Sequence, residues 1–150
     1  MRYELARLVA DTQLEEAIPL LKRELEMDPA HYLASTLLGR VYVILRRPDE
    51  AIPLLETALR QRPGLLEAQK ALGQAWMGKQ DFARSLAPLQ AVAASEPEDD
   101  QIHFLLAQAW RGLGKPEEAA KEMQLHQQIL RRLAESGGDS GDTKVSSPAP

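Results

Sequence analysis

The chain has 150 residues, of which 18 are basic and 22 acidic, so its formal net charge is −4 at pH 7. Charges of both signs are spread along the chain, which argues against broad nucleic-acid binding because that requires a basic face. The absence of cysteine excludes disulfides, thiolate catalysis and cysteine metal sites, and no apolar run is long enough to insert into a membrane.

Eight helices are predicted, because apolar residues recur at helical spacing between residues that start or stop helices. Pro29 is expected in the first turn of a helix, where its missing N–H costs nothing. Ser95 and Glu98 have the spacing of a capping box, and Gly112 and Gly114 are expected to close a helix. The predicted helices span about residues 2–10, 13–26, 30–45, 49–61, 64–78, 81–94, 98–112 and 116–134.

The chain repeats itself with a fixed period. Three prolines, Pro29, Pro63 and Pro97, lie 34 residues apart, and much of the surrounding sequence recurs with them. A constant period in the range of 20–50 residues indicates stacked helical units rather than one globular fold. Such an array works through its surface, because each unit packs only against its neighbours.

Small residues recur where the two helices of each unit are expected to cross. Two helices approach closely only where one of them offers a small side chain, and larger residues then fill the space beside the crossing. In the first helices the small residues are Gly39, Gly73 and Ala107, and in the second helices they are Ala51, Ser85 and Ala119. The large residues at fixed phases are Tyr42, Trp76 and Trp110, followed by Leu55, Leu89 and Met123.

These residues resemble a tetratricopeptide repeat array over roughly residues 1–133. The resemblance rests on motif positions in successive units: Leu38-Gly39, Tyr42, Ala51, Ala58 and Pro63; Leu72-Gly73, Trp76, Ser85, Val92 and Pro97; Leu106-Ala107, Trp110 and Ala119. It implies an all-α fold, a right-handed superhelical solenoid of antiparallel helix pairs in 34-residue repeats.

Five segments are expected along the chain. The last helix ends in a polar stretch suited to capping an array, and the residues after it are too poor in apolar side chains to repay the entropy of ordering. The segments are a partial N-terminal repeat (1–31), two repeats (32–65 and 66–99), a C-terminal repeat with an extended capping helix (100–135) and a disordered tail (136–150). The incomplete first repeat suggests that the chain belongs to a longer protein or that a partner covers this end.

No catalytic constellation is found, so we expect no enzyme activity, no cofactor and no metal. His31, His103 and His126 lie in different helices without metal-ligand spacing, and are interpreted as surface or packing residues. Trp76 and Trp110 share a phase with the motif aromatic residues of the repeats and are interpreted as core. The glycine-rich stretch at 111–114 lacks the Lys-Ser/Thr of a phosphate-binding loop.

The resemblance also implies a binding site, because the first helices of successive tetratricopeptide repeats line a concave groove. Arg40, Lys70 and Arg111 make this groove locally basic, which favours a partner peptide with acidic residues and an apolar anchor against Phe104 or Met77. The alternative is that these are ordinary solvated positions. The twelve implied groove residues are Leu33, Thr36, Arg40, Val43, Glu67, Lys70, Gln74, Met77, Gln101, Phe104, Gln108 and Arg111.

The sequence therefore favours a non-enzymatic protein-interaction scaffold that binds a partner protein or peptide in its concave groove. Two alternatives stay open: a substrate-recruiting segment of a larger enzyme, such as a glycosyltransferase or kinase, and a module that self-associates through its N-terminal end. The absence of asparagine and the excess of arginine over lysine indicate a GC-rich bacterial genome. A cytoplasmic location is expected, because no signal-peptide core is found, with the periplasm open if the chain is a fragment.

Overall fold

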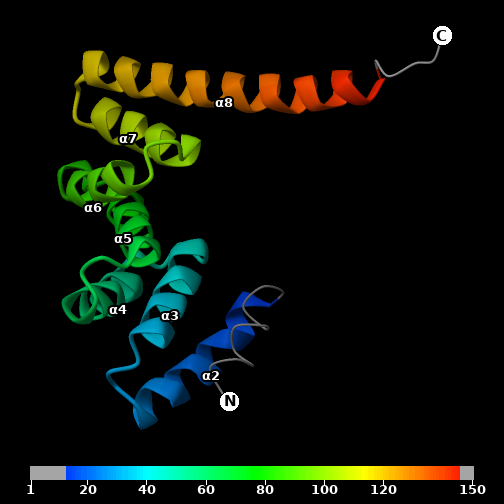
Figure 1. Ribbon diagram of the computed structural model, residues 1–150. Helices are drawn as coiled ribbons and strands as arrows, with labels where there is room; N and C mark the ends of the chain where they lie inside the picture. Colours follow the sequence, from blue (N-terminus) through cyan, green and yellow to red (C-terminus); the bar gives the residue numbers. More distant parts are fainter. Residues whose placement is uncertain (1–12, 146–150) are drawn as a thin grey trace. The chain divides into compact units, whose positions relative to one another are not determined.

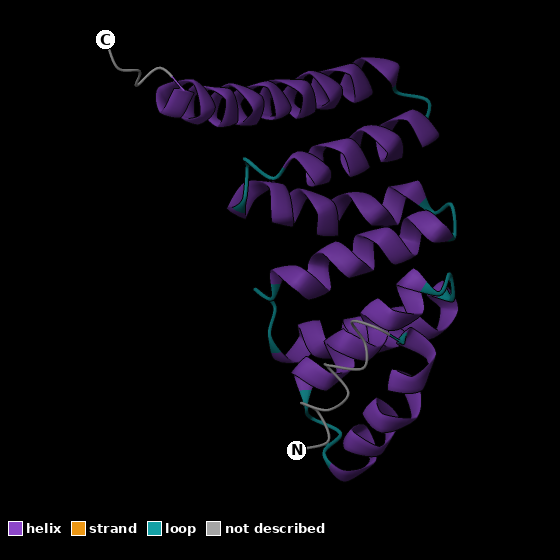
Figure 2. Cartoon of the chain, turned by 90° about the vertical axis from the view of Figure 1, so that its right-hand side faces the viewer, coloured by secondary structure: helices purple, strands orange, loops and turns teal. Residues whose placement is uncertain are grey.

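The computed structural model describes residues 13–145, with side chains for residues 13–137, and every regular element in this range is an α-helix (Figure 1). The all-α prediction is confirmed, whereas the helix expected at residues 2–10 lies outside the described residues. Figure 2 shows the helices joined by short loops. The helices are α2 (Leu14–Met27), α3 (Tyr32–Ile44), α4 (Pro48–Gln61), α5 (Leu66–Gly78), α6 (Phe82–Ser95), α7 (Asp100–Gly112) and α8 (Pro116–Val145).

The 34-residue period is reproduced by the helix starts. The first helices begin at Tyr32, Leu66 and Asp100, each 34 residues after the one before. The second helices begin at residues 14, 48, 82 and 116, with the same spacing. One supersecondary unit, a pair of helices, is therefore repeated without insertion or deletion.

The first helices begin two residues later than predicted, because the recurring proline lies in a turn and not in the helix. Residues 29 and 30 form a turn, and the N–H of His31 donates to the carbonyl oxygen of Asp28 at 3.1 Å. Pro29 thus occupies the second position of a β-turn, where its fixed φ is favourable. Equivalent bonds join Leu65 to Arg62 at 3.2 Å and Asp99 to Glu96 at 3.1 Å.

The predicted capping box of Ser95 and Glu98 is wrong for the same reason. Ser95 is the last residue of α6, and the turn that follows moves the start of α7 to Asp100. The cap is Asp99, whose side chain accepts a hydrogen bond from the N–H of Gln101 at 3.0 Å. In α3 the cap is His31, whose Nδ1 accepts from the N–H of Ala34 at 3.1 Å.

The turn between the two helices of a unit is also repeated. The backbone takes a positive φ at Arg46 (61°), Gln80 (61°) and Gly114 (74°), which are 34 residues apart. After Arg46, the N–H of Arg47 donates to the carbonyl oxygen of Tyr42 at 2.8 Å, which closes the end of α3. The prediction that Gly114 closes a helix is confirmed. In the other two turns the residue with positive φ is Arg46 or Gln80, each of which carries a side chain.

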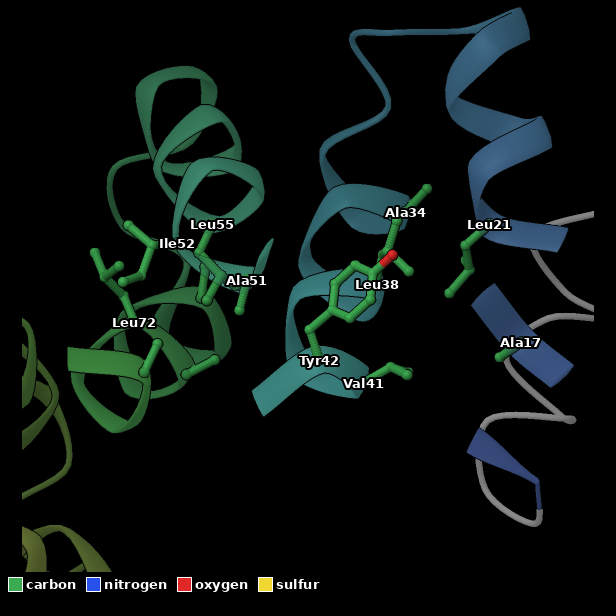
Figure 3. Close-up of a cluster of buried hydrophobic side chains, with 13 residues drawn as sticks. Ala17, Leu21, Ala34, Leu38, Val41, Tyr42, Ala51, Ile52, Leu55 and Leu72 are labelled. Carbon is green, nitrogen blue, oxygen red and sulfur yellow. The ribbon is translucent and has the colours of Figure 1, made fainter. Parts of the chain in front are cut away.

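Two compact units divide the chain, residues 1–92 and residues 93–150. In the first unit α3 packs against α2, α4 and α5. Figure 3 shows Leu21 of α2 pointing towards Leu38 and Tyr42 of α3. The buried cluster of this unit consists of Ala17, Leu21, Ala34, Leu38, Val41, Tyr42, Ala51, Ile52, Leu55, Ala68, Ala71, Leu72 and Ala75.

In the second unit α7 and α8 pack side by side (Figures 1 and 2). Buried apolar residues such as Ile102, Leu106 and Ile129 lie on these two helices. The guanidinium of Arg132 lies 3.1 Å from the carboxylate of Glu98, which ties the later turns of α8 to the residues before α7.

Helix α8 runs to Val145 and so passes the end at about residue 134 that the sequence predicts. Its residues up to 137 are described with their side chains, and those beyond Ala134 are exposed. The disordered tail at 136–150 and the five segment boundaries stay predictions.

A candidate peptide-binding surface

An ion pair joins two residues of the predicted groove. A guanidinium nitrogen of Arg40 on α3 lies 3.6 Å from the carboxylate of Glu67 on α5, and both side chains are well exposed. The two first helices pack against each other, so residues 27 positions apart in sequence share one surface. An exposed pair of this kind contributes little stability, typically about 0–1 kcal/mol.

Other predicted residues of α3 and α5 are also accessible. Leu33 is exposed, and Lys70 and Met77 are half-buried, so part of each residue remains open to solvent. We refer to the accessible residues from these two helices as the α3–α5 face: Leu33, Arg40, Val43, Glu67, Lys70, Gln74 and Met77.

Thr36 is placed differently from its predicted neighbours. It is only 2% exposed, and its hydroxyl donates a hydrogen bond to the carbonyl oxygen of Tyr32 at 2.8 Å. Its side chain therefore offers nothing to a ligand, although its spacing along α3 matches that of the groove residues.

One end of the α3–α5 face is hollowed by a cavity of about 350 Å³. Two of its lining residues, Val43 and Gln74, belong to the predicted groove, whereas Ile44 and Arg46 were missed by the sequence reasoning. A signal did exist, because Gly78 and Gly112 stand where Ile44 stands in the repeat. The complete lining is Val43, Ile44, Arg46, Pro48, Gln74, Ala75 and Gly78.

A larger cavity, of about 450 Å³, lies between α2, α3 and α4. Its lining includes Glu50, whose carboxylate accepts two hydrogen bonds from Arg47 at 2.7 and 2.9 Å. The guanidinium of Arg47 also lies 4.9 Å from the centre of the Tyr42 ring. The charge of Glu50 is thus already matched within the chain. The other two charged residues of the lining, Lys22 and Glu26 of α2, have opposite signs, so the lining favours neither an acidic nor a basic ligand.

The predicted residues of the second unit lie along α7. Gln101, Phe104, Gln108 and Arg111 are all exposed, and their spacing of three, four and three residues places them on one helix face. Phe104 is 39% exposed, and its ring centre lies 5.5 Å from that of His126 on α8. Part of this ring is therefore committed to packing within the unit.

The three histidines have structural roles. His103 is buried, with Nδ1 at 2.7 Å from the carboxylate of Glu122 and Nε2 at 2.8 Å from the carbonyl oxygen of Pro97. His126 has Nδ1 at 2.8 Å from the backbone carbonyl oxygen of Asp100. Among the described residues no group of three or more His, Asp or Glu side chains is arranged to hold a metal ion.

The two tryptophans carry cations of the same chain on their rings. Trp76 is partly buried, with the guanidinium of Arg84 at 4.9 Å and the ammonium of Lys79 at 6.0 Å from its centre. Trp110 is partly buried, with the ammonium of Lys115 at 5.8 Å. These contacts favour the packing interpretation over an open ligand box.

The family comparison matches two stretches of the chain that overlap. Models described as tetratricopeptide repeat match residues 8–75 and residues 70–134. Together they cover residues 8–134, which include most of the region that resembles the repeat array. No curated protein sequence gives a significant match.

Solved structures of MamA have a similar fold. A MamA segment from Desulfovibrio magneticus RS-1 aligns with a TM-score of 0.82 and 21% identity, over 87% of this chain and 75% of that chain. MamA of MSR-1 aligns with a TM-score of 0.79 and 22% identity, over 87% and 76%. At this identity the likeness shows the fold alone. Within residues 13–145, no helix has both the length and the apolar character to cross a bilayer.

Proposed function

The chain belongs to the tetratricopeptide repeat family, and from this premise we propose that it is a non-enzymatic adaptor that binds a segment of a partner protein. Arrays of such repeats typically act as interaction scaffolds through their surfaces. The proposed binding surface of the first unit is the α3–α5 face, and that of the second unit, taken by itself, is the exposed face of α7.

The observation that carries the proposal is the ion pair between Arg40 and Glu67. It brings side chains from two successive first helices onto one accessible surface, as a groove that reads an extended peptide requires. The flanking residues Leu33 and Met77 add apolar area on the same two helices. This mixture of apolar contact and charge is typical of peptide-recognition surfaces.

The same ion pair refines the kind of partner that we propose. In the free protein Glu67 already neutralises Arg40. An acidic residue of the partner would therefore replace Glu67 as the ion-pair partner of Arg40. Lys70 lies on the same helix as Glu67, one turn further on, and adds positive charge. An acidic partner gains from this exchange, whereas a basic partner would meet Arg40 and Lys70.

The test is affinity capture from a lysate of the native cells. The site variant is Arg40→Glu with Lys70→Glu, and the control is Arg23→Glu with Arg60→Glu, which reverses two exposed charges on α2 and α4. Both variants change the net charge by the same amount. Circular dichroism establishes that each variant is folded before capture.

The proposal expects a partner that the wild-type chain and the control hold and that the site variant loses. Equal capture by all three proteins would contradict it. Capture of the chain itself alone would favour the self-association alternative, and concentration-dependent mass in solution would support that outcome.

A further inference from the structure

We propose that the cavity between α3 and α5 seats an apolar side chain of the partner, and that Arg46 binds a carboxylate next to that side chain. This inference rests on the proposed function and deepens it, because it names the chemistry of the partner segment. It also moves the apolar anchor away from Phe104 and Met77.

The apolar part of the cavity argues for an apolar side chain as its occupant. Five of the seven lining residues carry no polar side-chain group: Val43, Ile44, Pro48, Ala75 and Gly78. Ile44 is 57% exposed although it is a large aliphatic residue at the end of a helix. A ligand that covers it removes apolar surface from water, which is the main favourable contribution to association.

The size of the cavity limits what it can hold. A volume of about 350 Å³ lies near the lower end of the range of roughly 300–1,000 Å³ that is usual for ligand pockets. A side chain with its adjoining backbone fits a cavity of this size, whereas a packed helix pair of another protein does not.

The polar groups of the cavity argue for an acidic neighbour to that side chain. Arg46 is the one charged residue in the lining, and within the described part of the chain its side chain forms neither an ion pair nor a hydrogen bond. The same holds for the side-chain amide of Gln74. A guanidinium has only donors and matches a carboxylate with two parallel hydrogen bonds.

The backbone holds Arg46 at a fixed place. Its φ of 61° is set in a turn whose bonds run from the N–H of Arg46 to the carbonyl oxygen of Val43 at 3.0 Å and from the N–H of Arg47 to that of Tyr42 at 2.8 Å. A group presented from a fixed turn loses less entropy on binding than one on a mobile loop.

The combination of an aliphatic residue and a cation occurs at one turn of the array. The residues 34 and 68 positions after Ile44 are Gly78 and Gly112, and those after Arg46 are Gln80 and Gly114. The general fold does not require an isoleucine or an arginine here, since the equivalent turns form without them. We infer that these two side chains serve recognition.

The experiment selects binders from a displayed library of random peptides with the purified full chain, and measures their affinity by fluorescence polarisation. The inference predicts enrichment of an aliphatic or aromatic residue beside Asp or Glu. The key variant is Arg46→Gly, because glycine keeps the positive φ while it removes the guanidinium. The matched control is Gln80→Gly, the same change one repeat later.

Arg46→Gly should weaken binding of the selected peptide about tenfold or more, as loss of a bidentate pair predicts, whereas Gln80→Gly should leave it unchanged. Replacing the peptide's Asp or Glu by the amide should weaken binding to the wild type but not to Arg46→Gly. Ile44→Ala should weaken binding without unfolding α3, since alanine is a good helix former.

Peptides that lack an acid, or that bind Arg46→Gly as well as the wild type, would overturn the inference. If the Arg40→Glu, Lys70→Glu variant nevertheless fails to bind such peptides, the proposed function stands, and the partner's apolar side chain does not occupy this cavity. A selection that enriches no peptide would count against both.

Discussion

Gly39 lies directly against Leu55: a Cβ atom added to this glycine would stand 2.6 Å from both Cγ and Cδ2 of the leucine. One repeat later Gly73 has the same relationship to Leu89, again at 2.6 Å. Both leucines are fully buried, so neither has space to move aside. The crossings of α3 with α4 and of α5 with α6 therefore depend on a glycine opposite a leucine.

A methyl group at this crossing should destabilise the protein. We expect Gly73→Ala to lower the free energy of unfolding by about 1–3 kcal/mol, because overpacking against Leu89 outweighs the better helix propensity of alanine. Denaturation by urea measures the change. The control is Gly64→Ala, at a turn where an added Cβ meets nothing within 4 Å. Equal stability of the two variants would show that α5 and α6 do not cross as closely as described.

A glycine at a turn with positive φ should stabilise the protein. Gln80 has a φ of 61° although it carries a side chain, whereas Gly114 occupies the equivalent turn. We expect Gln80→Gly to raise the free energy of unfolding by about 0.5–1 kcal/mol and Gly114→Ala to lower it by about as much. Thermal unfolding of both variants checks the opposite signs, and a loss of stability in both would contradict the assigned turn geometry.

The pair formed by His103 and Glu122 should stabilise the second unit. Glu122→Ala leaves Nδ1 of the buried His103 without its partner, so we expect a loss of about 1–3 kcal/mol. Glu122→Gln should cost less, because its amide can donate to Nδ1 in place of the carboxylate that accepts there, while Nε2–H donates to the carbonyl oxygen of Pro97. Chemical denaturation compares both with Glu135→Ala, which removes an exposed carboxylate from the same helix.

Much of the fold could be predicted from the 34-residue period, because the residues that pack between helices recur with it. The small residues at 39 and 73 predicted the helix crossing correctly. The sequence predicts the start of α3 two residues too early, because Pro29 suits the second position of a β-turn as well as the first turn of a helix. Local preference alone does not separate the two.

The candidate site was less predictable than the fold. Spacing along α3 assigned Thr36 and Arg40 to one surface, but only the packed structure reveals that Thr36 is buried. Ile44 and Arg46 depart from the repeat pattern, so the recurring positions do not point to them. Recognition, unlike packing, is carried by the side chains that differ between repeats.

The ion pair on the α3–α5 face should contribute little to stability. We expect Arg40→Ala to change the free energy of unfolding by less than about 1 kcal/mol, since both partners are solvent-exposed. The same substitution should weaken capture of an acidic partner. A large loss of stability would mean that Arg40 serves the fold rather than binding.

Site-specific photo-crosslinking tests most directly whether the α3–α5 face binds a partner. A photoreactive amino acid is placed at Glu67 on this face and, in a separate protein, at Glu56, an exposed residue of α4. After irradiation in native cells, a partner bound to this face should give an adduct from residue 67 and none from residue 56. The same adducts from both positions, or a partner adduct from residue 56 alone, would contradict it.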